Sequence, residues 1–458
     1  MKVVFRTFCL FVLLANVLVT PSHSKIDDGG EKKKTSTGKS YLYSTRVERV
    51  ERPSSTAKEF TAERVWSGHD DWEPAIAVDP SSSYVYQMTT RYTGKHPCDI
   101  CKLPAIVFRS SSDGGANWSA DSFIALTRQS QNDPQIAVAN DGTIYAVFLN
   151  DYVPGIQFTK SKDHGATWTE PLRLTGGGRK PSYSDKPFLI ISPTGQHVYI
   201  AFNATDSWVV ASHNFGQSFL PAVKTNNDKR YWFHSGGAVS ANGDVYFAAA
   251  DYTQTFVGDV HIDVLKSSDK GKTWKTIRVD TSKETPACEW SDGCYLGFLG
   301  PAPGLAVDPA GKILFAYNAG NVAGGNERIY VRTSLNGENW SARQSISFGS
   351  GSVNNGFPVV EVGGTDDFRV VWQDNRNGPP NIWNTWYRRS TNGGHTWGPS
   401  IRLSDQPSGA PYKNAGGYFF PYGDYLEFAV DQHGKNYVIW GEGTSYDGPG
   451  GTWFTRGK

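Results

Sequence analysis

The sequence has no excess of charge of either sign, because 45 basic residues stand against 44 acidic ones and the formal net charge is +1. Without surplus Lys and Arg, the chain cannot supply the phosphate contacts that a nucleic acid or an anionic membrane requires, and we expect neither partner. Methionine is also rare, with two residues, whereas glycine reaches 49 and aromatic residues make up 13%. This balance is typical of an all-β protein with many tight turns.

Long hydrophobic runs are absent after the N-terminus, and no later segment has the 18 consecutive apolar residues typical of a membrane-spanning helix. The N-terminus combines a basic start (1–6), a short apolar stretch (8–19) and small residues at 22–24. This order is typical of a signal peptide. We expect cleavage after residue 24 and a soluble, secreted, extracellular protein. Residues 25–58 are polar and lack periodicity, so we expect a disordered leader there.

Cysteine is scarce, with five residues, and the first, Cys9, lies in the expected signal peptide. The other four form two close pairs, Cys98 with Cys101 and Cys288 with Cys294. In an exported chain this even count favours two local disulfides that pin long loops. A zinc site built from the same four thiolates is the alternative. No calcium-loop motif is complete, and we expect no metal and no other cofactor, although Asp-rich loops could hold a cation.

One turn motif recurs six times along the chain. The copies begin at Ser111, Ser161, Ser212, Ser267, Thr333 and Ser390, and each ends in an aromatic residue. The mean spacing from Trp118 to Trp397 is roughly 56 residues, a period that indicates an array of small sheets. In the motif, Asp or Asn bonds the amides of its own turn, Gly takes the positive-φ position and the final Trp buries apolar surface. The residues that we expect to be structural are Asp113, Trp118, Asp163, Trp168, Asp269, Trp274, Asn392 and Trp397.

This motif resembles the Asp-box, or bacterial neuraminidase repeat, of the sialidase-like propeller superfamily. The resemblance implies that the boxes lie on the face opposite the substrate site. Seven segments have the pattern expected for the first strand of a repeat, although the chain has only six boxes. These segments are 73–79, 133–139, 185–191, 236–240, 302–308, 357–361 and 425–431. Dividing residues 59–458 by seven gives about 57 residues per repeat, which matches the box spacing, whereas six repeats would give about 67.

We therefore predict a seven-bladed, all-β propeller over residues 59–458, closed by an N-terminal strand near 59–65, with six blades as the alternative. Such closure leaves no open sheet edge. The catalytic propeller of sialidases has six blades, so the predicted number departs from that family. If the boxes cap one face, the opposite mouth consists of the loops before each first strand and the loops between second and third strands.

The mouth loops are rich in residues suited to sugar chemistry. Tyr and Trp rings stack on sugars, carboxylates act as acid and base, and Arg clamps a carboxylate. The sialidase resemblance implies an arginine triad, a tyrosine nucleophile assisted by glutamate, and an aspartic acid/base. Transferred to this sequence, that template gives Arg91, Arg179 and Arg376 as clamps, Tyr418 or Tyr422 as nucleophile, Glu73 as its helper, and Asp70 or Asp71 as the acid. The Phe/Tyr-Arg-Ile-Pro signature that carries the first sialidase arginine is absent.

Further substrate-binding candidates in the mouth loops are Tyr231, Trp232, His234 and Trp290. His234 could be the general base of a polysaccharide lyase, or a histidine packed in the funnel wall. An ion pair with Asp374 is the structural alternative for Arg376. Asp133 and Asp185 recur at one register, which suggests that they cap the turn leading into a blade. Tyr152, Tyr183 and Lys186 also fall in these loops.

The sequence predicts a secreted carbohydrate-active protein whose partner is a glycan or glycoconjugate. Our first hypothesis is a sialidase-like exo-glycosidase acting on glycans with acidic sugars. The alternatives are a non-catalytic propeller that binds glycans or proteins, and a polysaccharide lyase acting on uronic-acid glycans. Asn117, Asn203 and Asn339 lie in glycosylation sequons, which would be used in a eukaryotic host.

Overall fold

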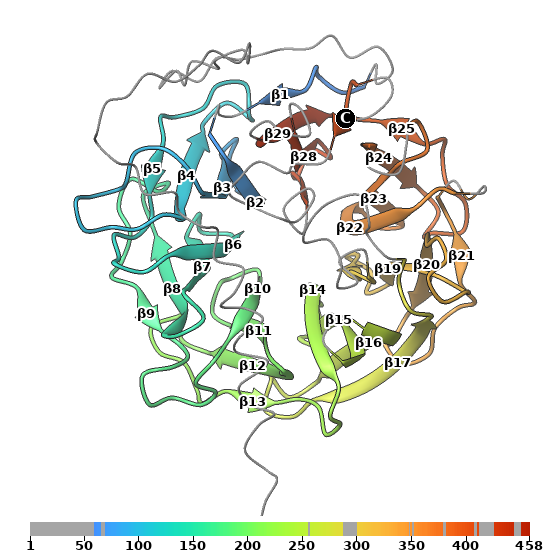
Figure 1. The fold of residues 1–458 in the computed structure, drawn as a ribbon, viewed down its shortest axis with the longest axis horizontal. Coiled ribbons are helices and arrows are strands. Elements are labelled where there is room, and N and C mark those ends of the chain that lie inside the picture. The colour runs from blue at the N-terminus through green and yellow to red at the C-terminus, as the bar shows by residue number, and fades with distance from the viewer. Residues whose placement is uncertain are drawn as a thin grey trace, which may run out of the picture. The chain divides into compact units, whose positions relative to one another are not determined.

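The computed structural model of this chain describes residues 59–65, 69–254, 257–286, 300–347, 349, 352–378, 382–406, 410–411, 426–443 and 450–458. The regular structure of these residues consists of β-strands alone, and they form seven sheets around a central axis, which confirms the seven-bladed propeller (Figure 1). None of the described segments forms a helix long and apolar enough to cross a membrane.

The first four blades each contain four antiparallel strands, numbered from the axis outward. Blade 1 consists of β2 (Asp71–Val78), β3 (Val85–Arg91), β4 (Ala105–Ser111) and β5 (Ser122–Phe123). Blade 2 consists of β6 (Gln131–Val138), β7 (Ile144–Asn150), β8 (Gly155–Ser161) and β9 (Leu172–Arg173). Blade 3 consists of β10 (Asp185–Ile191), β11 (Val198–Ala204), β12 (Asp206–Ser212) and β13 (Val223–Lys224). Blade 4 consists of β14 (Tyr231–Val239), β15 (Val245–Gln254), β16 (Val257–Ser267) and β17 (Lys275–Ser282).

The remaining three blades include the one that closes the ring. Blade 5 consists of β18 (Gly304–Val307), β19 (Ile313–Ala319), β20 (Arg328–Ser334) and β21 (Gln344–Ser345). Blade 6 consists of β22 (Asn355–Gly364), β23 (Asp367–Asp374), β24 (Ile382–Ser390) and β25 (Ile401–Arg402), and β26 (Ala410–Pro411) also pairs with β24. Blade 7 consists of β27 (Glu427–Val430), β28 (Asn436–Gly443), β29 (Gly450–Gly457) and β1 (Arg64–Val65).

The ring closes as the sequence predicts, because an N-terminal strand completes the last blade. Strand β1 runs antiparallel to β29, with Arg64 opposite Phe454 and Val65 opposite Trp453. Phe60 forms a further bridge with Gly457. The outer edge of blade 7 is therefore paired by a segment from the far end of the chain, which protects it from association with other chains.

The core lies between the faces of neighbouring blades. Between blades 1 and 2, Met88 and Phe108 pack with Ile144 and Phe148, all of them buried. The Trp that ends the second Asp-box reaches into this seam, and Trp168 packs edge-on against Phe108 with ring centroids 5.2 Å apart. Burial of these large apolar side chains is what holds the sheets in a ring.

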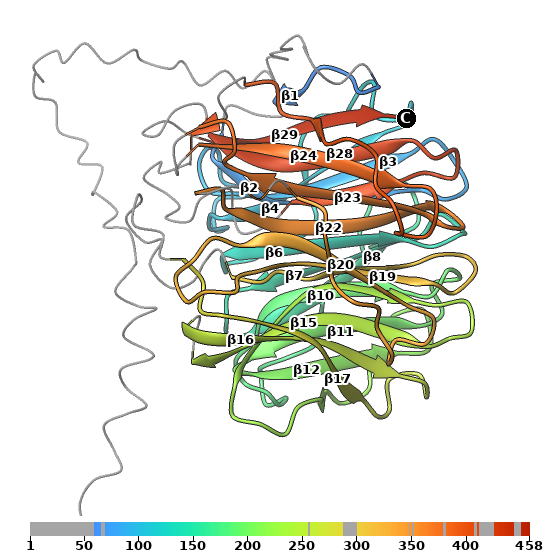
Figure 2. The same cartoon turned by 90° about the vertical axis from the view of Figure 1, so that its right-hand side faces the viewer.

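The Asp-box turns are stabilised by hydrogen bonds to their own Asp or Asn side chain, as the sequence predicts. The side chain and backbone of Thr167 hydrogen-bond the carboxylate of Asp163, and these bonds lower the pKa of Asp163 to about 2. Gly165 adopts φ of 87°, the conformation that glycine allows. Each box follows the third strand of its blade, and the strands run along the propeller axis (Figure 2). The loops before the first strands therefore lie at the opposite ends of the strands, where they form the mouth.

Candidate functional site

Charged residues occupy one repeated position at the mouth end of the inner strands. In blades 1 to 3, Glu73, Asp133 and Lys186 each precede a proline, sit at a shift in strand register and adopt φ between 43° and 53°. The expectation that Asp133 and Asp185 share one register is therefore wrong, because the residue equivalent to Asp133 is Lys186. A proline cannot donate a ladder hydrogen bond, and a bulge redirects the side chain next to it. In blade 4, the corresponding register shift places His234 at the same position.

These charged residues form a chain of contacts from blade 1 to blade 3. Glu73 is buried, and its Oε2 accepts hydrogen bonds from Thr90 Oγ1 at 2.6 Å and from the backbone amide of Asp133 at 3.1 Å. The Asp133 carboxylate in turn lies 3.5 Å from Lys186 Nζ. This separation is longer than the roughly 2.7–2.9 Å of a typical charge-assisted hydrogen bond.

Three tyrosines lie beside this chain, and we call Tyr152, Tyr183 and Tyr231, together with Asp185 and Lys186, the tyrosine cluster. The rings of Tyr152 and Tyr183 are stacked, with centroids 5.6 Å apart and planes 13° apart. The Tyr183 hydroxyl lies close enough to Tyr231 to act on its pKa, which it lowers. The three tyrosines come from the loop between β7 and β8, the loop before β10 and the first residue of β14, while Asp185 and Lys186 begin β10, so three blades build the cluster.

The electrostatics of the tyrosine cluster keep its hydroxyls protonated. The nearby Asp185 carboxylate raises the pKa of Tyr152 well above its ordinary value. Burial, followed by Asp185, raises the pKa of Tyr183 and of Tyr231. At neutral pH these groups stay protonated and donate hydrogen bonds, and they do not serve as tyrosinate nucleophiles.

The predicted clamp Arg91 and the predicted acid Asp71 bind each other. Both are buried, and Arg91 forms ion pairs with Asp71 at 2.8 Å and with Asp121 at 2.5 Å, which raise the pKa of Arg91 against the opposing effect of burial. The other predicted acid, Asp70, accepts a hydrogen bond from the indole of Trp72 at 2.9 Å. These contacts describe a structural network that ties the first two strands of blade 1 together.

The other two predicted clamps lie in different settings. Arg376 donates from Nε to both carboxylate oxygens of Asp374, at 2.9 and 3.0 Å, and its guanidinium lies 3.8 Å from the ring centroid of Trp386. This geometry agrees with the structural alternative for Arg376, the ion pair with Asp374. Arg179 is exposed in the loop between β9 and β10. Arg91 and Arg376 thus each form ion pairs with carboxylates of their own blade.

Two predicted binding residues of blade 4 are buried in its wall. Trp232 is 1% exposed and packs in the core between blades 3 and 4, so no ring face is open for stacking on a sugar. His234 is 5% exposed, and its Nε2 lies 2.8 Å from Ser207 Oγ. Burial lowers the pKa of His234 to about 3, so the imidazole is neutral at physiological pH. The half-buried Tyr231 is the predicted binding residue that joins the tyrosine cluster.

Several predicted residues lie outside the described part of the chain, namely Tyr418, Tyr422, Trp290, Cys288 and Cys294. The Cys98–Cys101 disulfide is present, which removes both sulfurs from the zinc alternative. Asn203 is fully buried and bonds the backbone carbonyl of Trp232, so its sequon cannot carry a glycan in the folded protein. Asn117 and Asn339 are exposed.

Sequence reasoning placed the members of the tyrosine cluster in mouth loops but did not select Tyr152, Tyr183, Asp185 or Lys186 as site residues. A pattern in the sequence does mark this repeated position. A charged residue precedes a proline in three successive repeats, at Glu73, Asp133 and Lys186. The convergence of the tyrosines depends on loop conformation, for which the repeat pattern gives no rule.

A second polar cluster lies in blade 4, where ligand atoms of Asp251, His261 and Asp263 fall within 4.8 Å of one another. Arg230 hydrogen-bonds Asp251, and Arg278 Nε lies 2.6 Å from Asp263 Oδ1. Two guanidinium groups therefore neutralise the two carboxylates. This is the pattern of a buried ion-pair network, in which the arginines supply the positive charge that the carboxylates require.

The comparisons with known proteins support the fold. No protein-family model and no curated protein matches the sequence. A solved polysaccharide lyase, described as a PL25 ulvan lyase, is 12% identical over 84% of this chain and 94% of its own, with a TM-score of 0.53. A protein of unknown function from Dyadobacter fermentans is 13% identical over 89% of this chain and 98% of its own, with a TM-score of 0.47.

The sialidase of Trypanosoma rangeli is also similar, at 13% identity and a TM-score of 0.42. The match covers 89% of this chain and 59% of the sialidase. At these identities the similarities concern the propeller architecture alone, and the chemistry must be argued from the side chains at the mouth.

Proposed function

We propose that this protein is carbohydrate-active and cleaves a glycan next to an acidic sugar by β-elimination at the mouth of blades 1 to 4. The observation that carries the proposal is the tyrosine cluster, in which three protonated tyrosines lie near Asp185 and Lys186. Half-buried aromatic rings beside hydrogen-bonding groups are suited to holding sugars, and the stacked Tyr152–Tyr183 pair offers such a surface.

The same geometry favours elimination over the hydrolysis expected by analogy with sialidases. Hydrolysis of that kind needs free arginines for the sugar carboxylate and a nucleophilic tyrosinate. Arg91 and Arg376 are held by carboxylates of their own, and the tyrosines of the cluster have raised pKa values. Elimination instead needs a cation for the carboxylate, a proton acceptor and a proton donor, and the cluster contains one group of each kind.

In the proposed reaction, Lys186 binds the carboxylate of a uronic acid and so favours loss of the neighbouring C5 proton. Asp185 accepts that proton, the C4–O4 bond breaks, and a C4–C5 double bond forms. Tyr183 protonates the departing O4 oxygen. The proton taken up by Asp185 returns to Tyr183 through solvent, so the site is restored without any external oxidant or reductant.

A solved propeller of related architecture supports this choice of substrate class. It is described as an ulvan lyase bound to -[GlcA(1-4)Rha3S]-, a segment that contains a uronic acid. The likeness is one of fold, and we extend it to this chain because the tyrosine cluster offers groups that such a reaction uses.

The test is an assay of the purified protein on a panel of uronic-acid polysaccharides, followed through the ultraviolet absorbance of the new double bond. Tyr183→Phe and Lys186→Gln should each lower kcat/KM by on the order of 100-fold or more. Tyr84→Phe is the matched control, because Tyr84 precedes β3 at the Asp-box end of blade 1, where its ring stacks on His164. Unchanged turnover in both mouth variants would overturn the assignment.

A second candidate is glycan binding without turnover, which the 49% exposure of Tyr152 favours, since an exposed ring can stack on a sugar without further machinery. A glycan array separates the two. Binding that is lost in Tyr152→Ala, with no cleavage on any member of the panel, would support the binding protein.

A further inference from the structure

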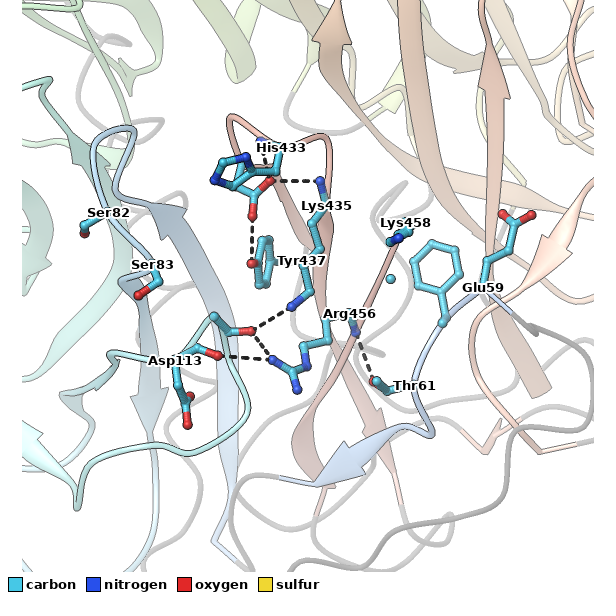
Figure 3. A pocket seen from close by; sticks show the side chains of 14 residues that line it. Glu59, Thr61, Ser82, Ser83, Asp113, His433, Lys435, Tyr437, Arg456 and Lys458 are labelled. Carbon is cyan, nitrogen blue, oxygen red and sulfur yellow. Dashed lines mark hydrogen bonds between the residues drawn. The ribbon is translucent and has the colours of Figure 1, made fainter.

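A cavity of about 640 Å³ opens on the Asp-box side of the propeller, in the seam between blades 7 and 1 (Figure 3). Its wall includes Lys435 in the turn before β28, Tyr437 on β28, Arg456 on β29, and the first Asp-box with Asp113 and Gly114. This is the end of the strands opposite the mouth, so the cavity is separate from the tyrosine cluster, and what it binds does not depend on the function proposed above.

Two cations converge in this cavity and share one backbone acceptor. Lys435 Nζ donates to the carbonyl of Gly114 at 3.2 Å, and Arg456 Nη1 donates to the same carbonyl and, at 3.4 Å, to that of Asp113. Within the described residues, neither side chain forms an ion pair, and Nε and Nη2 of Arg456 make no hydrogen bond. Several strong donors are therefore left for a ligand.

A comparison with blade 5 shows that Lys435 is unusual. Lys435 and Lys312 occupy the same place in equivalent turns, because the backbone amide of each donates to the aspartate four residues earlier, Asp431 at 2.9 Å and Asp308 at 2.8 Å. Lys312, however, forms an ion pair with the carboxylate of Asp366 in the next blade. The two lysines thus share a backbone setting and differ in their partner.

The missing partner of Lys435 can be located in the sequence. In blade 6, the amide of the Asp-box residue Gly393 donates to the carbonyl of Asp366 at 2.9 Å. In blade 1, the amide of the corresponding Gly114 donates to the carbonyl of Ser83, also at 2.9 Å. Ser83 therefore stands where blade 6 has Asp366, and the closing seam lacks the carboxylate that neutralises Lys312.

Two of the carboxylates that line the cavity, Asp431 and Asp113, are occupied within their own turns. Asp431 Oδ1 accepts from the amides of His433 and Lys435, each at 2.9 Å, and its Oδ2 accepts from the Tyr437 hydroxyl at 3.0 Å. Asp113 accepts from the amide of Asn117 at 2.8 Å and from its side chain at 2.7 Å. Figure 3 shows the Asp113 carboxylate directed away from Lys435 and Arg456.

The charge state of the two cations agrees with an unfilled anion site. Burial, followed by the neighbouring Arg456, lowers the pKa of Lys435. Burial, followed by Arg64, lowers the pKa of Arg456. A bound anion would offset both the desolvation and the mutual repulsion of these groups.

We propose that this cavity binds a tetrahedral oxyanion, the sulfate or phosphate ester of a sugar, between Lys435 and Arg456. The planar guanidinium of Arg456 offers Nε and Nη2 to two oxygens of the ester, while the ammonium of Lys435 contacts a third. The volume of the cavity leaves room for the sugar that carries the ester.

The experiment is calorimetric titration of the purified chain with glucose 6-sulfate, glucose 6-phosphate and unmodified glucose. We expect one of the two esters to bind and glucose not to bind, and the preferred ester identifies the source of the anion. Arg456→Gln and Lys435→Gln should each weaken binding by at least about tenfold, since each removes a charge-assisted hydrogen bond. Lys312→Gln is the matched control, because its lysine occupies the same turn in another seam, and it should bind as the unaltered protein does.

A second variant tests the register argument itself. Ser83→Asp places a carboxylate where blade 6 has Asp366, so it should pair with Lys435 and weaken ester binding by at least about tenfold without loss of thermal stability. Absence of binding for both esters at millimolar concentration would overturn the proposal. Binding that is unchanged in both Arg456→Gln and Ser83→Asp would overturn it as well.

Discussion

Gln135 and Glu427 are hydrogen-bonded to each other although they belong to blades 2 and 7, with Gln135 Nε2 lying 3.2 Å from Glu427 Oε1. Blade 1 stands between these blades, and its residue at the same register is the small Ala75. The bond therefore passes in front of blade 1, inside the central channel. Burial raises the pKa of Glu427 to about 7, and burial with the nearby Glu427 raises that of Glu361 to about 8.

The raised pKa of Glu427 predicts a pH-dependent effect on stability. The folded state holds the proton up to about pH 7 whereas the unfolded chain releases it near pH 4.5, so this residue's contribution to the free energy of unfolding falls as the pH rises through that window. Glu427→Gln keeps an acceptor for Gln135 and removes the charge. It should stabilise the protein by about 1–3 kcal/mol at pH 8 and by little at pH 4. Urea unfolding at the two pH values measures the difference, and a gain that is equal at both would contradict the assignment.

The glycine of the second Asp-box should be intolerant of substitution. A Cβ atom on Gly165 would lie 2.2 Å from the ring of Phe108 in the neighbouring blade, in addition to the strain of φ at 87°. Gly165→Ala should therefore lower the free energy of unfolding by about 2–4 kcal/mol. Gly243 has φ of 89°, but a Cβ atom there would have no neighbour within 4 Å, so Gly243→Ala should cost only about 1 kcal/mol. Equal losses would show that the box does not depend on its contact with Phe108.

Arg91 should act on stability and not on substrate binding. Its removal leaves Asp71 buried without its cation, and Arg91→Met should lower the free energy of unfolding by about 3 kcal/mol. The double variant Arg91→Met with Asp71→Asn should recover part of that loss, because the uncompensated charge is gone. Thermal unfolding and glycan binding are measured on the same preparations. Weakened binding at unchanged stability would instead indicate that Arg91 is the carboxylate clamp predicted from the sialidase resemblance.

The tyrosine cluster should bind and react through separate residues. Tyr152 is exposed and Tyr183 is half-buried beneath it, so Tyr152→Ala should mainly raise KM, whereas Tyr183→Phe should mainly lower kcat. Steady-state kinetics on one uronic-acid polysaccharide separate the two effects. The same change in both parameters for both variants would show that the stacked pair only binds the sugar.

The architecture could be predicted because a sequence motif recurs at regular spacing along the chain. Each Asp-box carries its own turn chemistry and ends in an aromatic residue that packs in a seam between blades, so spacing alone gives the number of sheets. The closing strand near 59–65 could be predicted because such closure leaves no open sheet edge. Neither inference needed the register of any pair of strands.

The site could be predicted only in outline, because its chemistry depends on pairings between strands. Asp71 and Arg91 lie directly opposite each other on β2 and β3, and they form an ion pair. From the sequence, Asp71 is predicted to be the acid and Arg91 to be a clamp for the substrate carboxylate. Trp232 alternates into the core beside the half-buried Tyr231. The tyrosine cluster is assembled from loops of three blades, and a linear pattern does not show which loop tips meet.

The most direct test of the proposed chemistry is cleavage of a uronic-acid polysaccharide in water enriched in oxygen-18, with the products analysed by mass spectrometry. Elimination adds no water, so the predicted products carry an unsaturated terminal sugar and no heavy oxygen from the cleavage step. Products that contain the heavy oxygen and a saturated terminal sugar would mean hydrolysis and would contradict the elimination chemistry assigned to the mouth.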